Sequence, residues 1–375
     1  MMTKTQTKIG FQHVGSFLRP DVLKQARKDF AAGNIDQATL TTIENESIKD
    51  LVNKEINAGL DYVTDGEFRR SYWHLDFFWG FEGITHIHYG EGYNFAHEET
   101  RDDTAILSGK IKFDKDTHPF IQHFKFLKSL TDGTNVEPKQ TIPAPAQLYI
   151  ELIRGSNADK IKEFYDTDEE LYADIEKAYH EAILAFYDEG ARVIQLDDCS
   201  WGLFLDDKFL ATPDGKAYAN SGIQDILLEL NNGAIKDLPE DLTINTHICR
   251  GNYHSDFAFA GGYGPVADTV FAKENVDTYF LEYDSNRAGN FEPLAKVSDN
   301  KRVVLGLITS KKGELEDRQV IIDRINEASK YLPLDRLWLS TQCGFASTEE
   351  GNVLTEQQEW AKLALVKSIQ EEVWG

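Results

Sequence analysis

Three short apolar runs of the chain end in residues of the types that bind zinc. His247 and Cys249 lie two positions apart, which places them on one face of a strand. Glu282 follows in FLEYD, and Cys343 follows in STQCGF. One imidazole, two thiolates and one carboxylate can complete a tetrahedral zinc shell, and sulfur ligands favour zinc over magnesium or calcium. We therefore interpret these four residues as a candidate zinc site.

The wide separation of the four residues along the chain indicates what kind of zinc site this is. His247 and Cys249 alone are more often an ordinary buried pair than a pair of ligands. A structural zinc usually joins nearby loops, whereas ligands scattered over several strand ends are typical of a catalytic metal with an open position. The remaining cysteine, Cys199 in DDCSW, is interpreted as a buried thiol.

Eight short apolar runs, separated by longer amphipathic stretches, must position these residues. The runs are rich in Val, Ile, Leu, Tyr or Thr, as buried parallel strands are. Helical periodicity fills four of the gaps clearly. The expected strands are Ile9–Phe17, Asp61–Gly66, Thr141–Gln147, Arg192–Asp197, Leu242–Cys249, Thr278–Asp284, Arg302–Ile308 and Leu337–Cys343, and the expected helices are Thr39–Ala58, Asp168–Tyr187, Asp317–Tyr331 and Thr355–Glu372.

This alternation predicts an α/β fold, a single (β/α)8 TIM barrel that forms one domain over residues 1–375. Functional residues of such barrels lie where the strands end. Seven of the eight expected strands end in polar residues, namely Ser16, Asp65 with Glu67, Gln147, Asp197 with Asp198, His247 with Cys249, Glu282 with Asp284, and Cys343.

A long aromatic insertion is expected after the second strand, over about residues 72–115. Its first part, Tyr72–Phe95, is rich in aromatic residues, contains histidines and has no regular period. Two interpretations remain open. The insertion is either a surface hairpin that packs over the barrel or a wall of the active site that stacks a flat ligand.

Charge and composition exclude several classes of partner. Lys and Arg number 39 against 63 Asp and Glu, so the net charge is 39 − 63 = −24, which disfavours nucleic acid and anionic membranes. Three cysteines are too few for a disulfide scaffold, and we expect a cytoplasmic protein. The segment Met1–Gln12 has no apolar core of a secretory signal, and no apolar run is long enough to span a membrane.

Seven motifs together resemble the cobalamin-independent methionine synthase family: HVGSFLRP, VTDGEFRR, IPAPAQL, VIQLDDCSW, INTHICRGNY, FLEYDS and STQCGF. The resemblance extends from residue 13 to residue 345 and is closest to short members that contain only the catalytic C-terminal-type barrel. It implies zinc-dependent transfer of a methyl group from a 5-methyltetrahydrofolate to the thiol of homocysteine, which gives methionine. The order of His-x-Cys, Glu and Cys is specific, whereas GSF or DGE alone is not.

The resemblance also implies roles for single residues. By motif position, the zinc ligands are His247, Cys249, Glu282 and Cys343. Ser16 matches the position that holds the carboxylate of the amino-acid substrate. Glu67 and Asp197 match the acidic positions that hold its ammonium group.

Each of the three substrate residues also has a structural alternative. Ser16 is of a type common in turns at strand ends. Glu67 and Asp197 can instead form salt bridges at the barrel mouth with Arg69, Arg70 or Arg192.

The methyl donor and the general acid are harder to place. A tertiary amine leaves readily only after protonation, so an acid is expected. Longer family members have a candidate histidine at the end of the seventh strand, where this chain has Thr309. Asp198, His13 and His254 remain candidate acids. Trp73 and Trp201 are expected to stack a pterin, together with Tyr72, Phe77, Phe78 and Trp79, but these side chains can equally cover the barrel wall.

Other functions remain open because the second barrel of the full-length synthases, which helps to build their folate cleft, is missing here. One is a related methyltransferase with a different donor or thiol acceptor. Another is a barrel that decarboxylates a porphyrin or moves methyl groups from a corrinoid, although such an enzyme has no need for the two cysteines. A third is a non-catalytic barrel that binds zinc or a thiol ligand, which the threonine at position 309 favours. The expected partners are small molecules, and a homodimer is left open.

Overall fold

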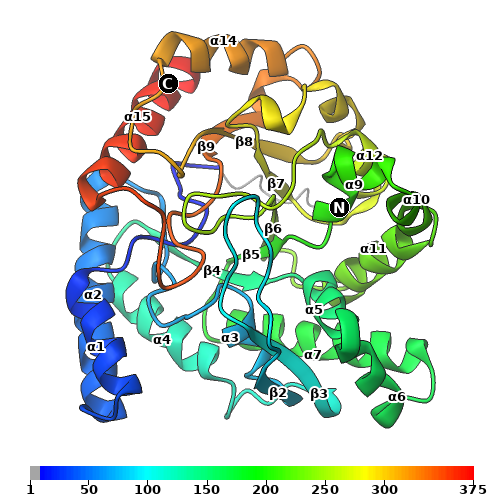
Figure 1. Cartoon of the computed structure of the whole chain (residues 1–375). Helices are drawn as coiled ribbons and strands as arrows, with labels where there is room; N and C mark the ends of the chain where they lie inside the picture. Colours follow the sequence, from blue (N-terminus) through cyan, green and yellow to red (C-terminus); the bar gives the residue numbers. More distant parts are fainter. Residues whose placement is uncertain (1–8) are drawn as a thin grey trace.

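A curled parallel sheet of seven strands forms the centre of the computed structural model, which describes residues 9–375 (Figure 1). Most of the segment Met1–Gln12, where no secretory signal is expected, lies outside the described residues. The strand order is β1-β4-β5-β6-β7-β8-β9, so each strand of the sheet pairs with its neighbours along the chain. These strands are β1 Tyr62–Val63, β4 Glu137–Pro143, β5 Val193–Asp198, β6 Thr243–Ile248, β7 Thr278–Glu282, β8 Arg302–Ile308 and β9 Leu337–Thr341.

The segment before the first helix lies between the two edges of this sheet. Gln12 forms an isolated parallel bridge with Tyr62 of β1. On the other side, the amide of Phe345 donates to the carbonyl of Ser16 at 2.8 Å. The segment contains no regular strand. It lies where the first predicted strand, residues 9–17, would complete a barrel of eight strands. The arrangement is that of a TIM-barrel-like α/β fold.

The other seven predicted strands are present, and one is displaced. The third was predicted at Thr141–Gln147 but lies at Glu137–Pro143. Pro145 begins helix α5 (Pro145–Leu152), because proline is favoured in the first helical turn and cannot donate to a sheet. Gln147 is therefore on a helix, not at a strand end.

Helices cover the outside of the sheet (Figure 1), and the four predicted helices are present. In α2 (Gln37–Ala58), the side chain of Asp36 accepts a hydrogen bond from the amide of Thr39. In α15 (Glu356–Trp374), Thr355 and Gln358 form a capping box at the start of the helix. The remaining helices are α1 Asp21–Ala31, α3 Leu75–Phe78, α4 Pro119–Thr131, α6 Ile161–Phe164, α7 Asp168–Asp188, α8 Gly202–Leu205, α9 Asp207–Ala211, α10 Pro213–Ala219, α11 Ile223–Ala234, α12 Gly264–Ala267, α13 Val270–Lys273 and α14 Arg318–Ala328, with 3-10 turns at Gly155–Lys160, Asn286–Ala288, Glu292–Lys296 and Leu334–Arg336.

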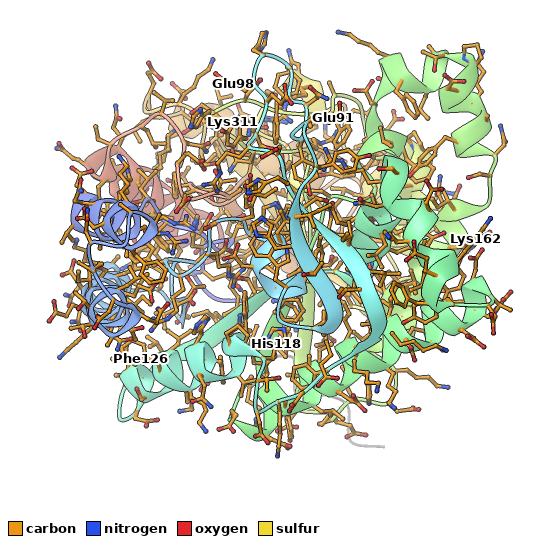
Figure 2. The ribbon with its side chains drawn as sticks, turned by 60° about the horizontal axis from the view of Figure 1, so that its bottom comes forward. Glu91, Glu98, His118, Phe126, Lys162 and Lys311 are labelled. Carbon is orange, nitrogen blue, oxygen red and sulfur yellow. The ribbon has the colours of Figure 1, made fainter. Side chains whose placement is uncertain are left out.

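An antiparallel hairpin, β2 (Glu82–His88) with β3 (Asp103–Lys112), lies between β1 and β4 along the chain. Figure 2 shows this hairpin crossing the front of the molecule, with Glu91 and Glu98 on the loop at its far end. In Figure 1 the same loop lies over the ends of the central strands. Across residues 9–375, no helix combines the length and the apolar character needed to cross a membrane.

Candidate active site

Neighbouring strands bring the four candidate zinc ligands together. His247 is in β6, Cys249 follows that strand, Glu282 ends β7, and Cys343 comes two residues after β9. One donor atom from each residue lies within 4.8 Å of the others, and all four side chains are buried. The sulfur atoms of Cys249 and Cys343 are 3.8 Å apart. Parallel strands that end at the same edge of the sheet thus gather residues from distant parts of the chain.

The surroundings of His247 fit a metal ligand. Its Nδ1 faces the carbonyl of Phe280 at 3.2 Å, and its Nε2 is buried without a hydrogen-bond partner among the described residues. A hydrogen bond from Nδ1–H to a carbonyl leaves a lone pair on Nε2, which is the usual arrangement for a metal-binding histidine. A buried acceptor without a hydrogen-bond partner destabilises the folded protein unless a cation binds there.

The carboxylate and the thiols also fit this interpretation. Glu282 Oε1 accepts from the amide of Arg250 at 2.9 Å, and Oε2 lies 3.4 Å from the Arg287 guanidinium. Burial acts to raise the pKa of Glu282, but Arg287 together with Lys311 and His247 lowers it, so the group stays ionised. The thiols differ, because hydrogen bonding to Cys249 first and burial second raise the pKa of Cys343 well above its usual value. A cation among these groups is what makes their thiolate forms favourable.

Three of the four candidate metal ligands, His247, Cys249 and Cys343, line an open cavity of about 500 Å³, whereas Glu282 lies behind them and is fully buried. Its lining includes all three proposed substrate residues, Ser16, Glu67 and Asp197, together with Cys249 and Cys343. Cys199 was predicted to be a buried thiol, but it is half-buried and also lines the cavity. Its amide donates to Gln147 Oε1 at 3.1 Å, which fixes the turn after β5 at the cavity wall.

Glu67 is held in an unusual backbone conformation. Its φ is 61° and that of Gly66 is 63°, both left-handed, which is rare for a residue other than glycine. Glu67 Oε1 accepts from the hydroxyl of Thr141 at 3.1 Å, whereas Oε2 is buried without a hydrogen-bond partner among residues 9–375. This turn therefore presents a carboxylate oxygen that is ready to accept a further donor.

Asp197 is the second buried carboxylate of the cavity. Its Oδ1 accepts from Gln195 Nε2 at 2.7 Å. Burial first, and then the negative charge of Glu67, raise the pKa of Asp197 to about 8. Two carboxylates that destabilise each other in a buried site are stabilised together by a bound cation such as an ammonium group.

The structural alternatives for these residues hold only in part. Arg70 lies 3.5 Å from Glu67, so one predicted salt bridge is present. Arg69 instead pairs with Glu44, and Arg192 pairs with Asp241. The hydroxyl of Ser16 accepts from the amide of Ala346 at 3.1 Å and keeps its own proton for another acceptor.

The structure separates the two tryptophans that were expected to stack a donor. Trp73 lines the cavity. Trp201 does not, because its ring is fully buried and its Nε1 donates to Asp198 Oδ2 at 2.9 Å, so it has no free face for a ligand. Phe77 and Phe78 are likewise fully buried in the core. For these three rings the structure therefore favours the other alternative, that they cover the barrel wall.

Two aromatic residues from the hairpin loop, Tyr93 and Phe95, take part in the cavity wall instead. They lie within the aromatic segment that the sequence marks as unusual, but its lack of a period gave no way to choose among its rings. Figure 2 shows this loop extending away from β2 and β3, with Glu91, another lining residue, labelled on it.

The predicted general acids lie elsewhere. None of the three candidate acids, Asp198, His13 and His254, is among the residues that line the cavity, and Thr309, which stands where longer family members have a histidine, is not among them either. Besides His247, the cavity lining includes one histidine that the sequence analysis did not select, His74, next to Trp73. Its Nε2 faces the Tyr93 hydroxyl at 3.3 Å, and burial followed by the charge of Arg154 lowers its pKa to about 3. His74 is thus a neutral imidazole at neutral pH.

Comparisons with known proteins show the family and the fold of the chain. Residues 11–365 match the sequence profile of the cobalamin-independent synthase catalytic domain. The uncharacterized protein YxjH of Bacillus subtilis is 46% identical over 375 residues, which cover 99% of this chain and 97% of YxjH. A crystal structure of a proposed vitamin-B12-independent methionine synthase from Listeria monocytogenes has a TM-score of 0.76 and 38% identity, with 98% of each chain covered. A B12-independent methionine synthase from Shewanella sp. W3-18-1 shares the fold, with a TM-score of 0.69, 19% identity and 96% of each chain covered.

Proposed function

The chain belongs to the cobalamin-independent methionine synthase family, and on that premise we propose that it is a zinc-dependent methyltransferase. In this proposal a methyl group moves from a 5-methyltetrahydrofolate-type donor to the thiol of homocysteine and gives methionine. The observation that supports it most strongly is the group of four buried donors, His247, Cys249, Glu282 and Cys343, beside a cavity with two buried carboxylates.

The four donors would hold the zinc ion. When bound there, zinc supplies the means to keep a substrate thiol deprotonated and nucleophilic at neutral pH. The residues around the donors already hold them in place, because Arg250 and Arg287 bind the two oxygens of Glu282 and the Phe280 carbonyl orients His247. Such outer contacts fix the direction of each ligand before a metal arrives.

The amino-acid end of homocysteine fits the polar side of the cavity. Glu67 Oε2 and the Asp197 carboxylate are positioned to accept hydrogen bonds from its ammonium group. Ser16 is positioned to donate its hydroxyl proton to the substrate carboxylate. Because the same cavity contains Cys249 and Cys343, a molecule held by its head group presents its thiol toward the proposed metal site.

The donor would occupy the aromatic side of the cavity. Trp73 and the hairpin residues Tyr93 and Phe95 supply the flat surfaces there. Offset stacking on such rings suits a pterin, and it also suits other flat donors. A methyltransferase that uses another donor or another thiol is therefore the nearest alternative.

A turnover assay tests the proposal. The zinc-loaded full chain is incubated with homocysteine and, in separate reactions, with methylated mono- and polyglutamyl tetrahydrofolates and other methyl donors, and methionine is measured by mass spectrometry. We expect methionine from at least one folate donor. If zinc and homocysteine both bind but no donor gives methionine, the proposal fails and the alternative of a non-catalytic binding protein is supported.

A further inference from the structure

A second group of metal-binding side chains lies on the hairpin, in a part of the molecule that the proposed reaction does not use. His86 and His88 are two positions apart in β2, so both project from one face of that strand. Asp103 of β3 pairs directly with His88 across the hairpin and therefore shares that face. We propose that His86, His88 and Asp103 form a separate site for a divalent transition cation such as Zn²⁺.

The distances between the donor atoms suit such a cation. His86 Nε2 lies 2.7 Å from Asp103 Oδ1, and His88 Nδ1 lies 3.8 Å from the same oxygen. One donor atom from each of the three residues lies within 4.8 Å of the others. Zinc bonds of 2.0–2.2 Å in tetrahedral geometry place the ligand atoms roughly 3.3 Å apart. Small side-chain rotations of His86 and His88 are enough to reach that spacing.

Asp103 is already oriented for this role. The Tyr72 hydroxyl donates to Asp103 Oδ2 at 3.0 Å, and Arg101 Nε lies 3.6 Å from the same oxygen. These contacts hold one oxygen of the carboxylate and leave Oδ1 directed at the two imidazoles. Outer hydrogen bonds of this kind are what fix a carboxylate ligand at a metal.

The chemistry of the donors selects the class of cation. Two imidazoles and a carboxylate suit zinc, copper or nickel, whereas magnesium and calcium prefer oxygen ligands alone. Asp102 Oδ1 lies 2.9 Å from His88 Nδ1 and adds a second carboxylate at the edge of the site. Arg101, whose Nε lies 3.6 Å from Asp103 Oδ2, is also engaged by Glu349 at 2.6 Å, so part of its charge is balanced elsewhere and the two carboxylates favour a bound cation.

The position of this site gives it a structural consequence. A cation there joins β2 to β3 next to the loop, residues 89–102, that carries Tyr93 and Phe95 into the cavity wall. Tyr72, which orients Asp103, lines that cavity as well. Occupation of the hairpin site would therefore stiffen one wall of the cavity without touching the four buried donors.

The test counts zinc ions on the full chain, purified without a polyhistidine tag and stripped of metal. Zinc is titrated calorimetrically into the wild type, His86→Ala and Asp103→Asn. We expect each variant to bind one zinc fewer than the wild type or to bind that zinc at least about 10-fold more weakly, since even losing an outer contact costs that much. The difference in zinc binding between the wild type and each variant reports on the hairpin site whether or not the buried cluster binds zinc. This proposal can therefore fail while the proposed function stands, and the reverse.

His97→Ala is the matched control. His97 is an exposed imidazole that faces a carboxylate, Asp256 Oδ1, at 3.2 Å, but the structure places no second imidazole in that pair. Its loss should leave the stoichiometry unchanged. Hydrogen exchange gives a second measurement, in which zinc should slow exchange over residues 82–112 in the wild type but not in His86→Ala. Equal zinc binding by the wild type and His86→Ala, or equal exchange with and without zinc in the wild type, would overturn the proposal.

Discussion

The molecule contains two groups of metal-binding side chains built from the same local pattern, and they differ in almost every other respect. His247 lies in β6 and Cys249 follows that strand two positions later, the same spacing that His86 and His88 have in β2. The first pair is buried among donors from two further strands, whereas the second is exposed on a hairpin and gains one carboxylate from the neighbouring strand. Two residues spaced two positions apart on a strand can supply a pair of metal ligands. The residues that neighbouring strands place beside this pair determine the chemistry of the site.

Burial is the physical basis of the difference. The buried cluster includes two thiols and an acceptor, His247 Nε2, that water does not reach, so a missing cation is costly there. On the hairpin, the side chain of His88 is 69% exposed, so water and Asp102 satisfy its imidazole when no cation is bound. The buried site is therefore expected to bind more tightly and to matter for catalysis, and the hairpin site is expected to be weaker.

The largest expected effect comes from Cys343→Ser. This change removes a thiolate from the buried cluster and should lower both zinc affinity and methionine formation at least about 100-fold, more than the loss of an outer contact does. Zinc content and turnover measure it. Cys199→Ser is the control, because Cys199 lines the same cavity but is not one of the four donors. If Cys343→Ser keeps its zinc, the ligand assignment is wrong.

An intermediate effect is expected from Glu67→Gln and Asp197→Asn. Each change removes one carboxylate from the cavity and should weaken homocysteine binding roughly 10- to 100-fold, the value of one charge-assisted hydrogen bond to the ammonium group, whose charge favours the ionised form of Asp197. Zinc content should stay the same, which separates the head-group site from the metal site. Glu44→Gln, which alters a carboxylate that pairs with Arg69, should leave homocysteine affinity unchanged. Unaltered affinity in Asp197→Asn would indicate a structural role for that side chain.

The barrel and the buried cluster are predictable from the sequence for a common reason. The strands are continuous apolar runs, and the residues that do chemistry follow them, so His247, Cys249, Glu282 and Cys343 could be placed at one edge of a sheet. The displaced third strand shows the limit of this reasoning. The third strand was predicted to continue to Gln147, although Pro145 in fact begins a helix.

The aromatic side of the cavity was less predictable, because burial of a ring depends on contacts that spacing does not reveal. Trp201 was selected as a ring that could stack a pterin, but Asp198 and Asn231 form a buried hydrogen-bonded network that fixes it in the core. Tyr93 and Phe95 reach the cavity only because the hairpin folds back over the strand ends. His74 was missed because it has no regular spacing from the other site residues.

The smallest expected effect is on thermal stability, and it compares the two sites directly. Zinc at 100 times its dissociation constant stabilises a folded chain by about 2.7 kcal/mol, which corresponds to a rise in Tm of roughly 3–6 °C. Free zinc held at 100 times the dissociation constant of the buried cluster should raise the Tm of the stripped protein by this amount in the wild type and in His86→Ala. The rise should vanish in Cys343→Ser. An equal rise in Cys343→Ser would mean that the hairpin site, not the buried cluster, carries the stabilisation.

The central claim is that the buried cluster holds a zinc ion with a position open to a substrate thiol, and X-ray absorption at the zinc edge tests it most directly. The full chain is loaded with one equivalent of zinc and measured with and without homocysteine. The account predicts two sulfur neighbours from Cys249 and Cys343, and a third sulfur when homocysteine is added. A zinc environment without sulfur, or one that does not change with homocysteine, would contradict it.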